Sequence, residues 1–362
     1  MSLIAVGPIV DDDLPLRLAE ALEEYLVQRR DADLAPELVA ALTELVLGGG
    51  KRLRPTFAWW GWRAAGGAAR GAEADAVLRA LVSLELLQCC ALVHDDVMDR
   101  STARRGRPTA HQAFAARHRR ERWAGDADHY GDCAAVLVGD LALAWADDAL
   151  VTAGLPGPAL VRAWRPWQAM RTEMMAGQHL DLLGGARRTE SVEAGLRVAR
   201  LKTAAYTVER PLHLGAAVAD APPNLIAALR EYGRDIGVAF QLRDDLLGVF
   251  GDVRLTGKPV GEDLREGKRT PLMATALGLA RAAGREDAVR VLRHCLEGGG
   301  PPGHDLADVR ALLHELGAVA VIEKRIAALT ASGLCALDRA VVLPIARDRL
   351  TDLAEQATAR KW

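Results

Sequence analysis

The strongest constraint in the sequence is an apolar run at residues 84–99 that ends in three carboxylates, Asp95, Asp96 and Asp99. On a helix, Asp95 and Asp99 lie four residues apart, on the same face and about 6 Å from each other along the axis. Carboxylates at this spacing can share a divalent cation that prefers oxygen ligands. The alternative is a helix whose last turn reaches solvent, with the three acids hydrated.

A second acid pair decides between these two interpretations. Asp244 and Asp245 also lie inside an apolar segment, residues 238–248. Ionised carboxylates are costly to bury without partners, and two such sites facing each other would hold several Mg²⁺ ions. The natural ligand of such a cluster is a phosphate or diphosphate. A third pair, Asp147 and Asp148, precedes a Gly/Pro loop, and we expect it near a helix end in solvent.

The composition indicates an all-α chain. Of the 362 residues, 50% are apolar but only 4% are aromatic, and this balance favours helix throughout. No strand-like alternation is long enough to predict a sheet. Residues 115–131 are predicted to form a charged, solvated loop, and residues 251–268 a lid. Helices are predicted at residues 14–27, 36–47, 59–71 (running into a loop), 76–98, 136–153, 159–183, 192–215 and 225–250, with two or three more after them.

Charge and terminal patterns argue against several classes of protein. A formal net charge of −2 does not fit a nucleic-acid binder that works by bulk electrostatics. No apolar stretch reaches about 18 residues without a charge, so we expect no transmembrane helix. The first ten residues lack the pattern of a secretory signal. Five cysteines without CxxC spacing indicate buried core residues in a reducing cytoplasm.

Basic residues follow a glycine run and, later, the first acid motif. Lys51 and Arg54 come directly after three glycines at residues 48–50, where the backbone can approach an anion closely. A helix end followed by surface cations is the alternative. Arg104 and Arg105 lie in an arginine-rich loop after the first acid motif. They could balance charge, or they could bind the free oxygens of a metal-bound diphosphate.

The sequence contains, in this order, the blocks GGGKRLRP, DDVMD with TARRGRP, LKT, FQLRDD and GKPVGEDLREGKRTPL. These blocks resemble the signature blocks of the trans-isoprenyl diphosphate synthases, or polyprenyl synthetases. The chain is most similar to bacterial geranylgeranyl diphosphate synthases, over roughly residues 15–355. The resemblance implies one domain over residues 1–362, a helical bundle of the isoprenoid synthase type with two opposed aspartate-rich helices around a central cavity. It also implies a cytoplasmic homodimer. Such an enzyme uses Mg²⁺ to condense isopentenyl diphosphate with an allylic diphosphate of five, ten or fifteen carbons.

The resemblance also implies a role for each candidate residue. Ionisation of an allylic diphosphate separates an anion from a carbocation, and Mg²⁺ would neutralise the leaving group. Asp95, Asp99 and Asp244 would hold the metal, with Asp96 and Asp245 as further ligands or supporting groups. The allylic diphosphate would be bound by Arg104, Lys202 and Lys258, supported by Thr203 and Gln241, with Lys268 as a further substrate-binding candidate. Isopentenyl diphosphate would be bound by Lys51, Arg54 and Arg105. No side chain resembles a dedicated general base, and in the family the released diphosphate is thought to take the proton.

Two positions depart from the family pattern. Gly248 stands where the second motif usually has a third Asp, and Asp252 lies nearby but after the expected end of the helix. Gln88 stands three residues after Glu85, where the family often has a His that contacts isopentenyl diphosphate. Gln88 can still donate a hydrogen bond but carries no charge.

The residues before the first motif predict the product length. On a helical wheel, Ala91, Leu87 and Leu84 lie within about 80° of Asp95, whereas Cys90 is turned roughly 140° away. The resemblance points to both Ala91 and Cys90, where short-chain members tend to carry aromatic residues. Small residues at both positions predict a product longer than fifteen carbons. Leu87 or Leu84 would then close the channel that holds the growing prenyl chain. We therefore expect geranylgeranyl diphosphate, with farnesyl or longer-chain products as the alternatives.

Two rival activities fit less well. A terpene cyclase usually needs aromatic side chains to steer its carbocations, and an aromatic content of 4% is a poor supply. It would also not need the basic pocket of Lys51, Arg54 and Arg105. A catalytically silent subunit of a heteromeric synthase would tend to lose the first aspartate motif, which this chain keeps.

Overall fold

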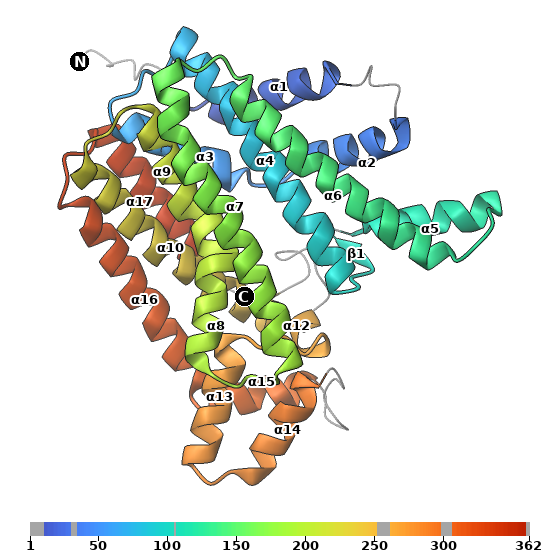
Figure 1. Ribbon diagram of the computed structural model, residues 1–362. Coiled ribbons are helices and arrows are strands. Elements are labelled where there is room, and N and C mark those ends of the chain that lie inside the picture. The colour runs from blue at the N-terminus through green and yellow to red at the C-terminus, as the bar shows by residue number, and fades with distance from the viewer. Residues whose placement is uncertain (1–10, 30–34, 105, 252–260, 298–305, 360–362) are drawn as a thin grey trace, which may run out of the picture.

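The computed structural model describes residues 11–29, 35–104, 106–251, 261–297 and 306–359, and of residue 262 only the backbone. Within these ranges the chain is a helical bundle, and its only strands are β1 (Ala103–Arg104) and β2 (Arg107–Pro108), which pair antiparallel (Figure 1). This architecture confirms the predicted all-α fold class. The helices are α1 (Leu14–Val27), α2 (Pro36–Leu47), α3 (Leu53–Ala64), α4 (Ala72–Met98), α5 (Ala110–Glu121), α6 (Ala127–Val151), α7 (Gly157–Ala186), α8 (Val192–Val198), η1 (Ala199–Glu209, a π-helix), α9 (Arg210–Val218), α10 (Pro223–Phe250), α12 (Glu262–Arg265), α13 (Pro271–Ala282), α14 (Glu286–Leu296), α15 (Leu306–Glu315), α16 (Ala318–Leu337) and α17 (Pro344–Thr358).

The helix α4 runs through the middle of the bundle and is buried on almost all sides, packed against α6, α1 and α3. A helix that is apolar all round must be buried, which explains its position. By length and composition alone α4 is the one described helix that could cross a membrane, since an 18-residue window has a mean hydropathy of 1.9. In the fold, 78% of that window is buried inside the protein, as expected for a core helix.

The helix α10 connects two hydrophobic cores. Its N-terminal half, with Leu229 and Tyr232, packs into the large core around α3, α4, α6 and α7. Its C-terminal half, with Leu242 and Leu246, packs into a second core formed with α13 to α16. Because α10 belongs to both, the two cores share one rigid element. The single domain over residues 1–362 stays a prediction.

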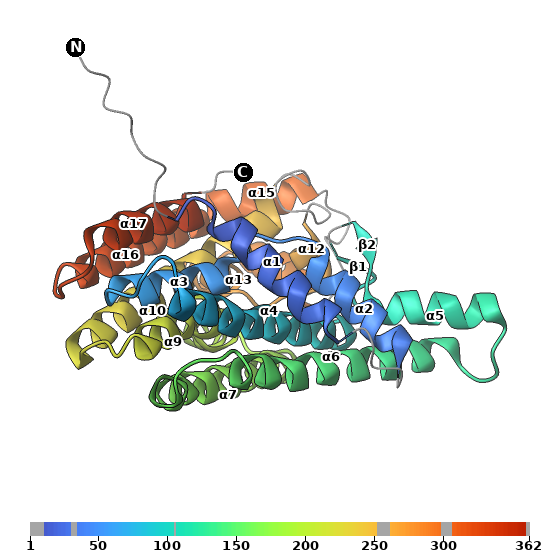
Figure 2. The same ribbon diagram turned by 90° about the horizontal axis from the view of Figure 1, so that it is seen from above.

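Several predicted segments differ from the structure. Residues 115–131 are not a solvated loop but contain most of α5 and the start of α6. The side chain of Asp126 caps α6 by accepting hydrogen bonds from the backbone N–H groups of Asp128 and His129. On the inner face of α5, Phe114 and His118 pack against the ring of Tyr130. The high charge of this segment therefore lies on one exposed face of a helical hairpin, which projects from the bundle in Figure 2.

The predicted helix at residues 192–215 is three consecutive elements, α8, η1 and α9, and the predicted lid contains the short helix α12. Residues 252–260 of that lid, and with them Asp252, lie outside the described residues. Asp148 is exposed as expected, but Asp147 is half-buried and accepts hydrogen bonds from Trp167 and Arg171. The prediction of buried cysteines is correct for three of the five and wrong for Cys133 and Cys335, which are exposed.

Candidate active site

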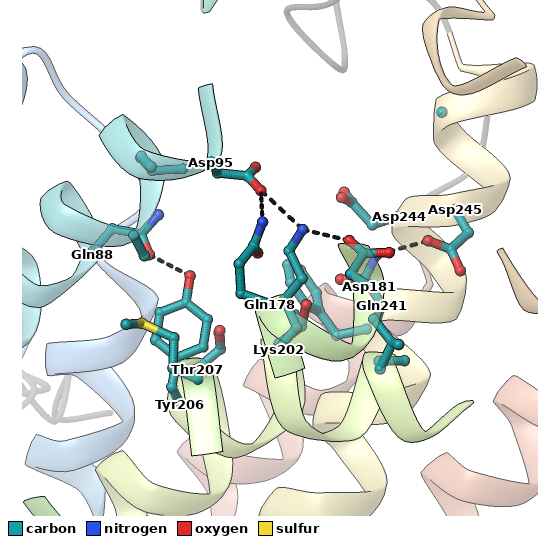
Figure 3. Close-up of a pocket in the computed structure, with 18 of the residues that line it drawn as sticks. Gln88, Asp95, Gln178, Asp181, Lys202, Tyr206, Thr207, Gln241, Asp244 and Asp245 are labelled. Atoms are coloured by element: carbon teal, nitrogen blue, oxygen red, sulfur yellow. Dashed lines mark hydrogen bonds and ion pairs between the residues drawn. The ribbon is translucent and has the colours of Figure 1, made fainter. Parts of the chain in front are cut away.

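A cavity of about 660 Å³ opens between α4, η1, α7 and α10, and Asp95 faces Asp244 and Asp245 across it (Figure 3). Most of the other predicted binding residues line the same cavity. They are Lys51, Arg54, Gln88, Arg104, Lys202, Thr203, Gln241 and Lys268. Arg105 and Lys258 lie outside the described residues. Residues from distant parts of the chain are thus brought together much as the motifs predict.

Lys202 is the central cation of the site. Its Nζ atom donates to Asp95 Oδ1 at 2.9 Å and to Asp181 Oδ2 at 2.7 Å, and Gln178 Nε2 donates to Asp95 Oδ1 at 3.0 Å (Figure 3). Gln178 and Asp181 lie on α7 and have no place in the predicted site. Their spacing of three residues puts them on one face of that helix, but the sequence contains no sign that this face meets Lys202.

Gly177 explains why α7 comes so close to η1. A Cβ atom at this position would lie 2.2 Å from the backbone nitrogen of Lys202. Only glycine allows the two backbones to touch here. This close approach brings Gln178 and Asp181 to the lysine.

Electrostatics keep Asp95 and Lys202 charged. Burial alone would raise the pKa of Asp95, but Lys202 and Arg104 hold the pKa below its usual range. Burial would likewise lower the pKa of Lys202, yet the charges of Asp95 and Asp181 raise the pKa well above its usual range. The site therefore holds a charged pair in contact with an open cavity.

The other two acids of the first motif have different surroundings. Asp96 is buried and receives three hydrogen bonds of 2.7 to 3.0 Å from Arg104, so this carboxylate faces the arginine rather than the cavity. Asp99 is half-buried at the end of α4, where burial and the charge of Asp95 raise its pKa to about 6. This carboxyl group therefore ionises near pH 6 in the metal-free protein.

On the opposite wall, Asp244 is exposed toward solvent, whereas Asp245 is buried and accepts a hydrogen bond of 2.7 Å from Gln241 Nε2. Burial and the nearby carboxylates of Asp263 and Asp244 raise the pKa of Asp245 well above its usual range. Lys268 lies near this wall, 2.9 Å from Glu266 and 3.4 Å from Asp263.

These carboxylates fit a hard divalent cation by chemistry, because Mg²⁺ is bound by oxygen ligands. In the part of the chain that the structure describes, no three His, Cys, Asp or Glu side chains converge closely enough to form a metal site on their own. Instead, Asp95 and Asp244 stand on opposite walls with Lys202 between them (Figure 3). Asp95 and Asp244 would therefore need further oxygen ligands, such as those of a diphosphate, to hold Mg²⁺.

A second cationic region lies at the N-terminal end of α3, next to the glycine run. Arg54 donates to Thr207 Oγ1 at 2.8 Å and stacks over the ring of Tyr206 at 4.1 Å. Its buried Nε atom has no hydrogen-bond partner among the described residues. Tyr206 in turn donates to Gln88 Oε1 at 2.8 Å, so Gln88 is bound to the opposite helix (Figure 3). An unpaired buried donor in a cavity favours an anionic ligand.

Two residues beside this region are not among the predicted site residues. Arg52 forms an ion pair with the buried Glu85 and also donates to the carbonyl of Val46. The pair holds the chain after the glycine run against α4. Both residues line the cavity, but their charges are already matched.

The predicted chain-length residues separate into two groups. Ala91 lines the cavity together with Leu92 and, from α7, Met174. Leu84, Leu87 and Cys90 are fully buried and are not part of the described lining. The thiol of Cys90 contacts the ring of His94, whose other nitrogen contacts the carbonyl of Val136 on α6. For Cys90 the helical wheel is thus right: this side chain faces α6 and not the cavity.

Comparisons with known proteins agree with this geometry. The family model described as polyprenyl synthetase matches residues 35–298. The chain is 34% identical over 293 residues to geranylfarnesyl diphosphate synthase from Aeropyrum pernix, which covers 80% of this chain and 83% of that protein. It is 32% identical over 259 residues to geranylgeranyl diphosphate synthase from Sulfolobus acidocaldarius, covering 71% of this chain and 72% of that one.

A solved structure is similar over nearly the whole length. It is the crystal structure of geranylgeranyl pyrophosphate synthase from Corynebacterium glutamicum, complexed with isoprenyl diphosphate and magnesium. The match has a TM-score of 0.92 and 45% identity, and it covers 97% of this chain and 99% of that one. The chain therefore belongs to the polyprenyl synthetase family and is a trans-isoprenyl diphosphate synthase, a prenyltransferase that makes trans-prenyl diphosphates.

Proposed function

We propose that this enzyme is a Mg²⁺-dependent geranylgeranyl diphosphate synthase, which adds isopentenyl diphosphate to allylic diphosphates. The observation that carries the proposal is the placement of Asp95 and Asp244 on opposite walls of one cavity that also contains a separate cationic region at Lys51 and Arg54. The two acidic walls together suit a metal-bound leaving group, and the cationic region suits a diphosphate held by cations alone. Two diphosphates can therefore bind with their hydrocarbon parts in the same cavity.

The side chains have distinct tasks in this reaction. Asp95, Asp99 and Asp244 would hold Mg²⁺, which supplies charge neutralisation to the departing diphosphate. Lys202 stays protonated and lies beside Asp95, so it can donate to the oxygens of the allylic diphosphate. Arg104 is placed by Asp96 to donate to the same group, with Thr203, Gln241, Lys258 and Lys268 in support.

The cationic region would bind isopentenyl diphosphate. Among the described residues, the buried Nε atom of Arg54 has no hydrogen-bond partner, and Lys51 and Gln88 also line the cavity. Arg105 would join them. The cavity wall also contains Ala91, Met174 and Phe240, which would exclude water from the allylic carbocation.

The twenty-carbon product is supported by the small side chain of Ala91 on the cavity wall. Purified protein should be incubated with labelled isopentenyl diphosphate and each allylic starter, with Mg²⁺ or with a chelator, and the products sized after dephosphorylation. We expect mainly twenty-carbon product and none with the chelator. A mainly fifteen- or twenty-five-carbon product would refute the chain length but not the class of reaction.

We also infer a cytoplasmic homodimer. Its support is the outer face of α6, where Val136, Leu137 and Val151 are exposed although apolar. These side chains lie along one side of the helix, Val151 about 21 Å from Leu137, and a partner subunit packed along α6 would cover them. Light scattering should give twice the chain mass of 38.8 kDa, and Leu137→Asp should lower it. A monomeric wild-type protein would refute the dimer.

A further inference from the structure

The two acidic helices are not equivalent. Asp95 and Asp99 lie four residues apart near the end of α4, and Asp244 and Gly248 have the same spacing near the end of α10. Residues four apart lie on the same helical face. On α4 both positions have a carboxylate, whereas on α10 the second position has no side chain. Gly248 nevertheless lines the active-site cavity.

The space beside Gly248 is filled by another carboxylate. A Cβ atom at residue 248 would lie 1.8 Å from Oδ2 and 2.6 Å from Cγ of Asp263. Asp263 belongs to α12, and its side chain is 14% exposed. Its carboxylate thus occupies the volume that a side chain on α10 would take. No larger residue fits at position 248 unless Asp263 moves.

The charges around Asp263 show that it shares a region with the acids of α10. Asp263 and Asp244 both raise the pKa of Asp245, so the three carboxylates lie within electrostatic range of one another. Lys268 balances them: it lies 3.4 Å from Asp263, and its charge also acts on Asp95 and Asp99 across the cavity. In the metal-free protein a lysine therefore stands near the place where cations are proposed to bind.

We propose that Asp263 supplies to the α10 side of the metal site the carboxylate that residue 248 lacks. Asp244 and Asp263 then bind Mg²⁺ from two different helices, and Lys268 is released to contact a diphosphate oxygen. This assignment rests on the proposed function, because it requires that Asp244 binds the metal. It also explains why glycine stands at position 248: the residue leaves room for a ligand that comes from α12.

The test measures binding rather than turnover. Calorimetry gives the affinity for inorganic diphosphate at a series of Mg²⁺ concentrations. Asp263→Ala should weaken the Mg²⁺-dependent binding roughly 10- to 100-fold, as for other groups that support a metal site. Gly248→Ala should weaken it as well, because the new methyl group displaces the Asp263 carboxylate. The double variant should bind no more weakly than Asp263→Ala alone, since both changes remove the same contact.

Recovery of the Mg²⁺-dependent affinity would be stronger evidence than its loss. With the carboxylate moved back to α10, Gly248→Asp combined with Asp263→Ala should recover most of the lost affinity. Glu266→Gln is the matched control, because Glu266 also pairs with Lys268 but does not lie against Gly248. A loss in Glu266→Gln equal to that in Asp263→Ala would overturn the proposal, since Asp263 would then act through Lys268.

Two variants distinguish an error in the proposed metal site from an error in the proposed role of Asp263. If Asp244→Ala leaves Mg²⁺-dependent binding unchanged, the proposed metal site is wrong. If Asp244→Ala weakens it and Asp263→Ala does not, only the role of Asp263 is wrong. Thermal unfolding with and without Mg²⁺ and diphosphate shows that each variant is folded, and the single variants at positions 248 and 263 test the same contact independently.

Discussion

Replacing Ala91 with phenylalanine should shorten the product. Ala91 lies on the cavity wall four residues before Asp95, about 6 Å along the helix axis. One extended isoprenoid unit spans four bonds, or about 5 Å. A fifteen-carbon starter bound at the acid motif therefore reaches about 15 Å into the cavity, well past residue 91, whereas a five-carbon starter does not reach it.

The size of the effect follows from packing. Accommodating a ring and a prenyl chain in the same space costs about 1–3 kcal/mol, which corresponds to a roughly 5- to 140-fold loss of the step that makes the twenty-carbon product. Labelled products of the Ala91→Phe enzyme should thus be mainly ten or fifteen carbons long, as measured by chromatography after dephosphorylation.

Cys90→Phe provides the matched control, since the same ring is added one residue earlier but points at α6. It should lower the melting temperature by overpacking the core and leave the product length unchanged. An Ala91→Phe enzyme that keeps both its activity and its original products would show that the prenyl tail runs elsewhere.

Three further predictions concern metal, substrates and pH. Asp95→Ala or Asp244→Ala should reduce turnover by orders of magnitude while circular dichroism stays unchanged, and near-normal activity of either variant would contradict the metal site. Lys51→Ala should raise the Michaelis constant for isopentenyl diphosphate more than that for the allylic substrate, and Lys202→Ala should do the reverse; identical patterns would contradict two separate pockets. Because the pKa of Asp99 is raised to about 6 in the metal-free fold, its contribution to stability should fall as the pH rises through about 6, while the affinity for Mg²⁺ should increase. Unfolding curves and Mg²⁺ titrations between pH 5 and 8, compared with Asp99→Asn, would measure both effects, and a Mg²⁺ affinity independent of pH would contradict them.

The parts of the site that could be predicted are those in which a charged side chain within an apolar segment needs an oppositely charged partner. Asp95 and Asp244 each follow a long apolar run, so each requires a cation, and their pairing across a cavity follows from the family resemblance. By contrast, Gln178 and Asp181 lie on a helix with no unusual local pattern. The close contact of Gly177 with Lys202 brings them to the lysine, and this contact joins segments that the sequence does not relate.

The failures in secondary structure also have physical causes. The charged residues at 115–131 indicate exposure to solvent, but they fit a loop and the outer face of a helix equally well. The hydrogen bonds that Asp126 accepts at the start of α6 favour the helix. A period of 3.6 residues cannot reveal a π-helix, so residues 192–215 were indistinguishable from one continuous α-helix. The role that we propose for Asp263 has no signal in the α10 motif, because this residue comes from α12, 15 residues after Gly248 in the chain.

The π-helix η1 has a consequence for how this segment can evolve. Each of its turns contains about one residue more than an α-helical turn, since its hydrogen bonds run from i to i+5. Lys202, Tyr206 and Thr207 all use this wider spacing to meet partners on α4, α7 and α3. Loss of a single codon between Ala199 and Glu209 would let the helix tighten and would turn every later residue by about 100°. We therefore expect η1 to tolerate no insertion or deletion among homologous genes.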